Sequence, residues 1–216
     1  MLLAIDTSTQ LAGLALFDGG VLAELAWVAG RKHSSQLLPQ VEQLLRLVGL
    51  DVSALTAITA AVGPGSFTGV RVGLAAAQGL AVALDRPVYG ISTLDILAAG
   101  QESSAWPVRP LLDAGRNRFA TALYAPSGGG FERVGEMLGI ELSQLADLVV
   151  EPCLLCGDLD GPAREQIRAM LGERVQVASP ALSVRRPAVL AQLGWERLRA
   201  GEAGDPALLQ PLYLSR

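Results

Sequence analysis

The segment 60-AAVGPGSFTGVRVGLAAAQGLAVAL-84 decides the fold, because it joins an apolar run, a glycine-rich turn and an almost uncharged helix. Backbone amides at the start of a helix can hold a phosphate, and glycines can equally let a helix approach a sheet closely. The turn lacks the Gly-Lys-Ser/Thr ending of a triphosphate-binding loop, and Pro64 removes one amide donor. We therefore predict a packing turn first and an anion or nucleotide site second. The residues of that second possibility are Asp6, Thr7, Ser8, Gly65, Ser66, Thr68 and Arg71.

The composition indicates a compact globular chain. Half of the 216 residues are hydrophobic, which is enough for one domain or two small lobes. The formal net charge is −4, and the basic residues are scattered, so a direct grip on a nucleic-acid backbone is not expected. The apolar N-terminus has no basic segment and is interrupted by Asp6, and the nearly uncharged run at 72–84 is short for a bilayer. We expect a cytoplasmic protein without a membrane partner.

The first hundred residues read as three strands, a helix, a strand, the glycine-rich turn with its helix, a strand and a short helix. The expected strands cover 2–5, 13–17, 21–28, 55–63 and 86–92, and the first helix runs from a Ser34 or Ser35 cap to Gly49. The elements then recur in the same order from Trp106. A shift of 107 residues places Asp113 on Asp6. The repeat predicts two related lobes with mixed sheets flanked by helices.

Two lobes that each begin with a strand, an Asp and a hairpin have the layout of the actin-like, sugar-kinase and Hsp70 (ASKHA) fold class. We place the first lobe at 1–103 and a smaller second lobe at 104–186. The C-terminal helix, about 187–216, is able to pack back on the first lobe. This assignment concerns the fold and by itself assigns no activity.

Few side chains are suited to catalysis. Cys153 and Cys156 form a lone C-x-x-C on an expected strand, where positions three apart point to opposite faces, so we interpret them as two buried structural cysteines. The sequence contains one histidine, His33, which we expect on the surface at a helix start or in a partner contact. Asp6 and Asp113 are predicted to hold their own hairpin loops through side-chain-to-backbone hydrogen bonds. We predict no catalytic residue and no metal site.

Two helices carry more apolar surface than one core contact needs. In the first helix the apolar residues span an arc of about 180°, against the ~100° stripe typical of a surface helix. In the second helix, between Val70 and Leu84, only Arg71 and Gln78 are polar. A helix that is apolar all round is buried inside its own protein or by a partner. We predict an interface with a second chain formed by His33, Leu37, Leu38, Val41, Leu45, Val70, Leu74 and Gln78.

Several motifs together resemble the TsaB family, also called YeaZ. They are "LLAIDTST" at the N-terminus, "HSSQLLPQVEQLL", "AVGPGSFTGVRVGLAAAQGLA", "GISTLDILA" and the closing "PLYLSR". The specific part covers roughly the first hundred residues, and the second lobe matches mainly in layout. The turn from Asp113 to Phe119 departs from the family pattern, because it lacks a Glu and shifts the Gly.

The resemblance implies an accessory role in making threonylcarbamoyladenosine in tRNA. TsaB proteins are non-catalytic relatives of TsaD, which binds a metal through a His-x-x-x-His pair and transfers the threonylcarbamoyl group. They pair with TsaD, and an ATPase, TsaE, joins the assembly. The resemblance therefore implies a TsaD heterodimer, a homodimer when TsaD is absent, and only indirect contact with tRNA. No cofactor of its own is implied, although ATP or ADP could bind a composite site with the partners.

A second interpretation stays open from the sequence alone. The chain could be a free-standing small ATPase or phosphotransferase of the actin-like class, with its nucleotide between the "DTST" and "DAGRN" hairpins. The single histidine and the apolar helices favour the accessory subunit.

Overall fold

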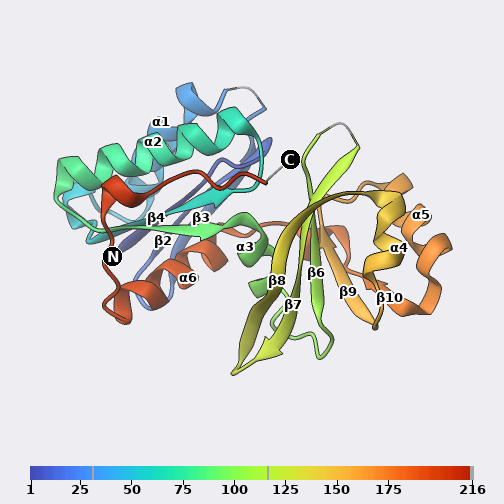
Figure 1. The fold of residues 1–216 in the computed structure, drawn as a ribbon. Coiled ribbons are helices and arrows are strands. Elements are labelled where there is room, and N and C mark those ends of the chain that lie inside the picture. The colour runs from blue at the N-terminus through green and yellow to red at the C-terminus, as the bar shows by residue number, and fades with distance from the viewer. Residues whose placement is uncertain (31, 116, 215–216) are drawn as a thin grey trace. The chain divides into compact units, whose positions relative to one another are not determined.

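The computed structural model describes residues 1–30, 32–115 and 117–214, and it divides into two compact units (Figure 1). Unit 1 contains Met1–Thr93 and Arg186–Leu212. Unit 2 contains Leu94–Arg185 together with Tyr213 and Leu214. The division lies ten residues before the predicted boundary, because the helix α3 (Thr93–Ala99) packs in unit 2 rather than in unit 1.

Unit 1 is built on a five-stranded mixed sheet in the order β3-β2-β1-β4-β5. β1, β2 and β3 form an antiparallel meander, and β4 and β5 continue from β1 in parallel. The two parallel crossovers are made through helices, as parallel strands require. The strands are Leu2–Asp6 (β1), Leu11–Phe17 (β2), Val21–Val28 (β3), Ala57–Gly63 (β4) and Val88–Ser92 (β5).

Helices cover both faces of this sheet. α1 (His33–Leu47) and α2 (Phe67–Leu84) lie on one face, and α6 (Pro187–Arg199) lies on the other (Figure 1). The core under α1 and α2 contains the side chains that point to that face, among them Leu3, Ile5 and Ile58. On the opposite face Gly13 and Gly194 leave room for close packing, since a Cβ on Gly194 would lie 2.6 Å from Thr59.

Unit 2 repeats the same sheet, in the order β10-β9-β6-β7-β8. β6, β7 and β8 are antiparallel, and β9 and β10 continue from β6 in parallel. α3 covers one face, and α4 (Leu145–Leu148) and α5 (Gly161–Leu171) cover the other. The strands are Val108–Asp113 (β6), Arg118–Ser127 (β7), Gly130–Glu141 (β8), Cys153–Gly157 (β9) and Val175–Val177 (β10).

The matching strand orders confirm the predicted duplication. Asp6 ends β1 and Asp113 ends β6, and each carboxylate accepts a 2.8 Å hydrogen bond from the amide two residues later. The predicted role of both Asp residues in holding their loops is therefore confirmed. The twelve-residue strand β8 was not predicted from the sequence, because most of its residues are exposed and they show no apolar alternation.

The predicted cap of the first helix was wrong. α1 begins at His33 after Lys32, and no side chain caps it, so neither Ser34 nor Ser35 is the cap. The Ser35 hydroxyl instead donates a hydrogen bond to the Lys32 carbonyl.

By length and composition α2 is apolar enough to cross a membrane, and it is longer than the run at 72–84 considered from the sequence. Core helices meet the same criterion, and one side of α2 is buried against the sheet of unit 1.

Candidate functional site

The glycine-rich turn and the loop after β1 are bonded to each other. The Ser66 amide donates to the Ser8 carbonyl at 2.6 Å, and the Thr7 hydroxyl donates to the Gly69 carbonyl at 2.7 Å. Ser66 also caps α2, since its hydroxyl accepts from the Gly69 amide. The start of α2 is therefore joined directly to the end of β1.

The glycines are required because the two segments approach so closely. A Cβ on Gly65 would lie 2.2 Å from the Ser8 carbonyl oxygen, and one on Gly69 would lie 2.2 Å from the Thr7 carbonyl oxygen. One turn later, a Cβ on Gly73 would lie 2.4 Å from the Thr7 hydroxyl. This geometry supports the prediction that the turn sets a helix against its sheet.

The same hydrogen bonds occupy groups that were predicted to bind an anion. The Ser66 amide already has the Ser8 carbonyl as its acceptor, so it is not available to an anion. Asp6, Thr7 and Ser8 are buried, and the Asp6 carboxylate accepts from both the amide and the hydroxyl of Ser8. A buried carboxylate at this position repels anions. The prediction that the Ser66 amide binds an anion is wrong, because this amide donates to the Ser8 carbonyl within the fold.

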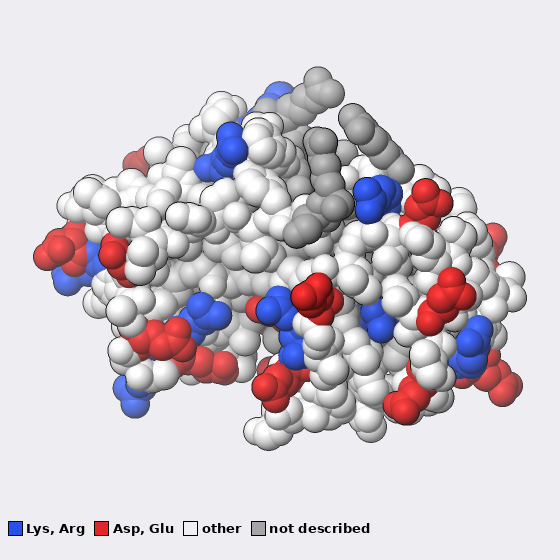
Figure 2. All heavy atoms as spheres, viewed as in Figure 1, with Lys and Arg blue, Asp and Glu red and all other residues white. Residues whose placement is uncertain are grey.

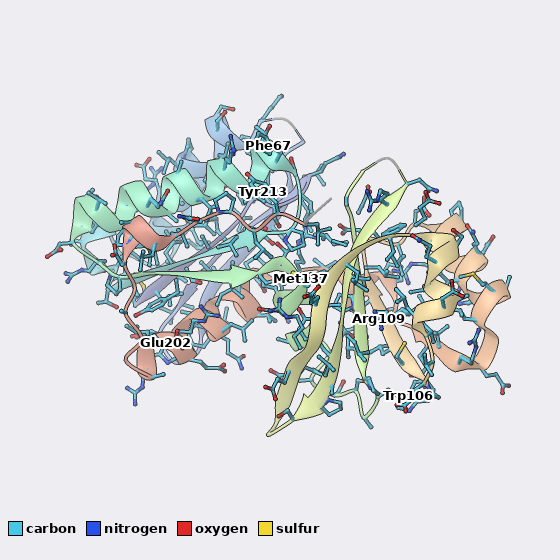
Figure 3. The ribbon with its side chains drawn as sticks, viewed as in Figure 1. Phe67, Trp106, Arg109, Met137, Glu202 and Tyr213 are labelled. Atoms are coloured by element: carbon cyan, nitrogen blue, oxygen red, sulfur yellow. The ribbon has the colours of Figure 1, made fainter. Side chains whose placement is uncertain are left out.

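Arg71, the proposed cationic helper, lies over an aromatic ring. Its guanidinium carbon is 3.8 Å from the centre of the Phe67 ring, which is a cation–π arrangement. Phe67 lies at the start of α2 (Figure 3). Thr68 and Arg71 are exposed, and their role in anion binding stays a prediction.

His33 is buried rather than on the surface, which corrects the expectation for this residue. It is 6% exposed at the start of α1, close to the charge of Asp6 and to the Thr9 backbone. Its Nδ1 atom has no hydrogen-bond partner among the described residues. Burial lowers the pKa of His33, and Asp6 opposes that shift in part. The structure thus places His33 beside the β1 loop instead of in an exposed contact surface.

Most of the predicted interface residues belong to the core of unit 1. Five of them are between 1% and 4% exposed: Leu37, Val41, Leu45, Val70 and Leu74. These predictions were wrong because α1 and α2 pack on each other as well as on the sheet, so a wide apolar arc is buried within the unit. Gln78 donates to the carbonyls of Pro206 and Leu209, and only Leu38, 54% exposed, remains an open apolar side chain.

A different set of residues forms the exposed side of α2, here called the outer face of α2. It consists of Phe67, Thr68, Arg71, Ala75, Gly79, Val82 and Ala83. Phe67 is 57% exposed and Val82 is 71% exposed, and the only charge is that of Arg71. Few charged side chains appear over α2 in the space-filling view (Figure 2).

The sequence contained the signal for this face. The small residues Gly69, Gly73, Ala77 and Ala81 recur every four positions and mark the side that packs on the sheet. The opposite side of the same helix is the outer face.

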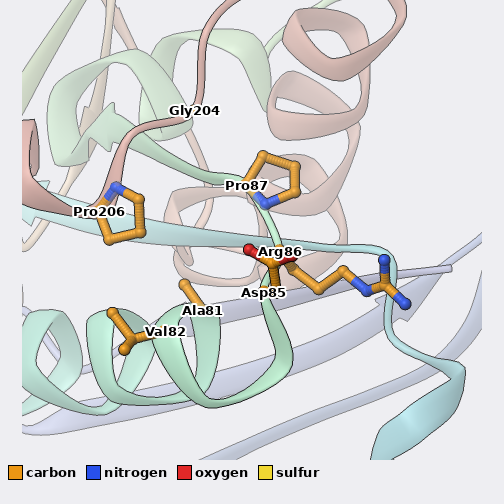
Figure 4. Close-up of a pocket in the computed structure, with 7 residues that line it drawn as sticks. All are labelled: Ala81, Val82, Asp85, Arg86, Pro87, Gly204 and Pro206. Atoms are coloured by element: carbon orange, nitrogen blue, oxygen red, sulfur yellow. The ribbon is translucent and has the colours of Figure 1, made fainter.

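A pocket of about 460 Å³ lies at the C-terminal end of α2 (Figure 4). Val82 belongs to both the pocket and the outer face. The Arg86 side chain points away from Val82 and Pro206, and its Nε donates to the Leu55 carbonyl at 3.1 Å. The lining consists of Ala81, Val82, Asp85, Arg86, Pro87, Gly204 and Pro206.

In unit 2 the two cysteines are buried free thiols, as predicted. They lie on opposite faces of the sheet, since Cys153 packs under α4 and α5 and Cys156 packs under α3. Burial raises the pKa of the Cys156 thiol to about 12. Near Cys153, Arg109 is 6% exposed and donates to the Leu148 carbonyl, and burial lowers its pKa (Figure 3). Burial also raises the pKa of the Cys153 thiol, and the charge of Arg109 opposes this shift in part. Both thiols are therefore protonated at neutral pH and unsuited to nucleophilic chemistry.

Comparison with known proteins agrees with this architecture. Residues 6–206 match the family model "TsaD: tRNA N6-adenosine threonylcarbamoyltransferase". A Bacillus subtilis relative, named tRNA threonylcarbamoyladenosine biosynthesis protein TsaB, is 34% identical over 99% of this chain and 93% of its own length. The Escherichia coli protein of the same name is 37% identical over 52% of this chain and 50% of its own length.

Solved structures of YeaZ proteins have a similar fold along the whole chain. YeaZ from Pseudomonas aeruginosa has a TM-score of 0.79 and 30% identity over 99% of both chains. A further Pseudomonas aeruginosa structure, described as similar to peptidase YEAZ, has a TM-score of 0.83 at the same identity and coverage. A putative 2-dehydro-3-deoxygalactonokinase from Sinorhizobium meliloti has a TM-score of 0.54 at 14% identity over the whole of both chains, a likeness of fold alone that supports the predicted ASKHA class.

The family model covers most of the chain, and the Bacillus subtilis TsaB protein and YeaZ from Pseudomonas aeruginosa each match 99% of it. The chain therefore belongs to the TsaD-related proteins and, within them, to the TsaB (YeaZ) family.

Proposed function

We propose that this chain is a non-catalytic subunit in the biosynthesis of tRNA threonylcarbamoyladenosine, and that it binds and activates a TsaD-type subunit through the outer face of α2. The observation that carries the proposal is this exposed face, which has two large apolar side chains and a single charge along the whole helix. Exposed apolar surface of this kind is typical of protein–protein contact sites. Ala75 and Gly79 at its centre allow a partner helix to approach closely.

The non-catalytic role is supported by the histidine content. A TsaD-like metal site takes two histidines from one helix, and this chain has only His33. His33 is buried against the loop after β1, where its environment is set by Asp6 and Thr9. The transferase chemistry named by the family model is accordingly assigned to the partner subunit.

The remaining partners follow from the family and from the charge of the chain. A net charge of −4 without a basic cluster supports indirect contact with tRNA through the TsaD-type subunit. We propose that the TsaE ATPase joins the assembled complex. Because the Ser66 amide and Asp6 are used within the fold, any ATP or ADP would bind a composite site that depends on the partners.

A charged side chain placed on the outer face of α2 tests the contact. Val82→Glu should weaken binding to the TsaD-type subunit of the same organism by at least about tenfold, since it buries a carboxylate in an apolar contact. Val150→Glu is the matched control, because Val150 is 85% exposed and lies in unit 2. Binding would be measured by titration calorimetry. Equal affinities for the two variants would contradict the proposed face.

The activity is tested separately from the contact. The isolated chain and its mixture with the TsaD-type and TsaE subunits would be assayed for ATP hydrolysis and for threonylcarbamoyl transfer to tRNA. We expect turnover only in the mixture. Substantial ATP hydrolysis by the isolated chain would support a free-standing ATPase instead.

A further inference from the structure

The pocket at the C-terminal end of α2 combines apolar walls with a carboxylate. It lies within unit 1, between the end of the helix and residues 204–206 of the C-terminal segment (Figure 4). Its volume of about 460 Å³ is in the range of small-molecule sites. Ala81, Val82 and Pro206 belong to the apolar walls, and Asp85 is the acidic residue of the lining. Mostly apolar walls with a polar group that fixes orientation are typical of such sites.

Asp85 is not used by the fold beyond its backbone. It ends α2 in a left-handed conformation, with φ at 53° and ψ at 55°, where glycine or asparagine is more usual. Its side chain is exposed, and among residues 1–30, 32–115 and 117–214 its carboxylate has neither a hydrogen-bond donor nor an ion-pair partner. The adjacent Arg86 donates from Nε to the Leu55 carbonyl instead. The pocket therefore contains an uncompensated negative charge.

The end of α2 adds to this negative charge. A helix C-terminus carries a partial negative charge, which cations stabilise and carboxylates oppose. The last turns of α1, α5 and α6 each contain arginine: Arg46 in α1, Arg168 in α5, and Arg197 and Arg199 in α6. In α2, whose 18 residues are all described, the last turn contains no basic residue. This helix end and Asp85 thus create a site that attracts a cation from outside the chain.

We infer that this pocket binds a small aliphatic amine, with the ammonium group at the Asp85 carboxylate and the methylene chain against Val82 and Pro206. A primary ammonium group has three N–H donors, which suit a carboxylate and the carbonyl groups at a helix end. The apolar walls favour an organic cation over a metal ion, which needs several oxygen ligands. The charge of the site selects the head of the ligand, and the walls select its chain.

A second carboxylate favours an amine with two charges. Asp205 is exposed between Gly204 and Pro206, which both line the pocket, and it accepts a 2.8 Å hydrogen bond from the Ala207 amide. A linear diamine should therefore bind more tightly than a monoamine with the same chain. This inference goes beyond the proposed function and does not depend on it, because the pocket is formed by unit 1 alone.

The test is a titration of the isolated full chain with diaminobutane, followed by the NMR shifts of the backbone amides. One exposed ion pair and a short methylene chain correspond to a dissociation constant on the order of 1–10 mM. The amides of Val82, Asp85 and Gly204 should shift and reach saturation. Butanol, which has the chain without the charge, should bind at least about fivefold more weakly.

Asp85→Asn removes the charge and keeps a residue that the left-handed conformation tolerates. Its affinity for diaminobutane should fall at least about fivefold. Glu165→Gln is the matched control, because Glu165 is exposed on α5 and the change in charge is the same. Without amine, Asp85→Asn should be as stable as the original chain or more stable, since a carboxylate leaves a helix C-terminus. A destabilised Asp85→Asn would overturn the inference, because the carboxylate would then serve the fold.

A lysine side chain of another protein has the same charged group and a similar chain. Acetyl-lysine amide, acetylated at the α-amino group, is therefore titrated in parallel, and tighter binding of this compound than of diaminobutane would overturn the assignment to a free amine. Shifts that do not saturate at ten times the expected dissociation constant, or an equal affinity in Asp85→Asn, would overturn the site itself. All of these measurements use the isolated chain, so their outcome is separate from binding to the TsaD-type subunit.

Discussion

At the scale of single residues, the glycines of α2 have opposite roles depending on the side of the helix. Gly69 and Gly73 face Thr7, where any side chain would collide, whereas a Cβ on Gly79 would meet no heavy atom within 4 Å. The first two are needed for the close approach of α2 to the end of β1. Within the chain itself, the third is an exposed helix position at which glycine lowers the stability of the helix.

We predict opposite effects of two alanine substitutions in this helix. Gly69→Ala should destabilise the protein by about 1–3 kcal/mol, because its Cβ would lie against the Thr7 carbonyl. Gly79→Ala should stabilise it by about 0.5–1 kcal/mol through helix propensity. Chemical denaturation of both variants measures the free energies of unfolding. Equal effects of the two substitutions would show that the packing at Thr7 is not limiting.

His33 predicts a pH dependence of stability. Burial lowers its pKa below the ordinary 6.5, so between the two values the unfolded chain binds a proton that the folded chain does not. The free energy of unfolding should therefore fall as the pH drops below about 6.5. Because His33 is the only histidine, His33→Gln should remove this component. The measurement is the free energy of unfolding of both proteins between pH 5 and pH 8, and parallel curves would contradict the prediction.

At the scale of elements, the C-terminal segment after α6 acts as a strap on unit 1. The Leu212 amide donates to the Val62 carbonyl at 2.7 Å, and Leu209 is buried in the core. Gln78 of α2 holds the middle of the segment by donating to the Pro206 and Leu209 carbonyls at 2.9 and 3.1 Å. One polar side chain in an apolar helix thus connects the helix to a segment about 130 residues further along the chain.

Gln78→Ala should therefore detach the strap from α2 while the rest of unit 1 stays folded. Two carbonyls lose their donor, which should cost about 1–3 kcal/mol locally. We expect faster hydrogen exchange at Leu209 and Leu212 and earlier proteolysis between residues 204 and 212. Gln192→Ala is the control, since Gln192 is exposed on α6. Unchanged exchange in the strap of Gln78→Ala would contradict this role.

The helices also show how far the sequence could be interpreted. The existence of α1 and α2 and the packing role of the turn followed from periodicity and glycine placement. The assignment of their faces did not, because the burial of Leu37, Val41 and Leu74 depends on how α1, α2 and the sheet meet. A single sequence gives the width of an apolar arc but not the number of neighbours that share it. Phe67 and Val82 became candidates only when the buried side of α2 was known.

At the scale of the whole molecule, the duplication was visible in the sequence because an apolar strand, an Asp and a hairpin recur. The third strand of the second copy, β8, was not, since its exposed glycines and glutamates carry no strand pattern. The boundary was also misplaced, because α3 follows directly on β5 and only its packing assigns it to unit 2. The order of elements in the sequence was thus enough to predict the topology. The assignment of an element such as α3 to one unit or the other required its packing contacts in the structure.

Unit 1 combines two segments that are far apart in the sequence, Met1–Thr93 and Arg186–Leu212. Removal of the second segment should therefore destabilise unit 1 more than unit 2. α6 packs on β1 and β2, and Arg186 and Ala188 bind Glu24 of β3. A chain that ends at residue 185 should therefore lose hydrogen-exchange protection throughout 1–93 and keep much of it in 108–157. Mass-spectrometric hydrogen exchange of the truncated and full chains measures both regions at once. Equal loss in the two regions would show that the units depend on each other.

The same discontinuity sets the order in which the protein is completed on the ribosome. The N-terminal strands are synthesised first, yet one face of their sheet stays uncovered until α6 and the strap have been made, whereas the middle of the chain already contains nearly all of its own sheet and helices. Domains generally fold as units during synthesis. The N-terminal half should accordingly reach its final form after the middle of the chain, once residues 186–212 have been synthesised. Until α6 and the strap are available, the face of the unit 1 sheet that α6 covers stays exposed.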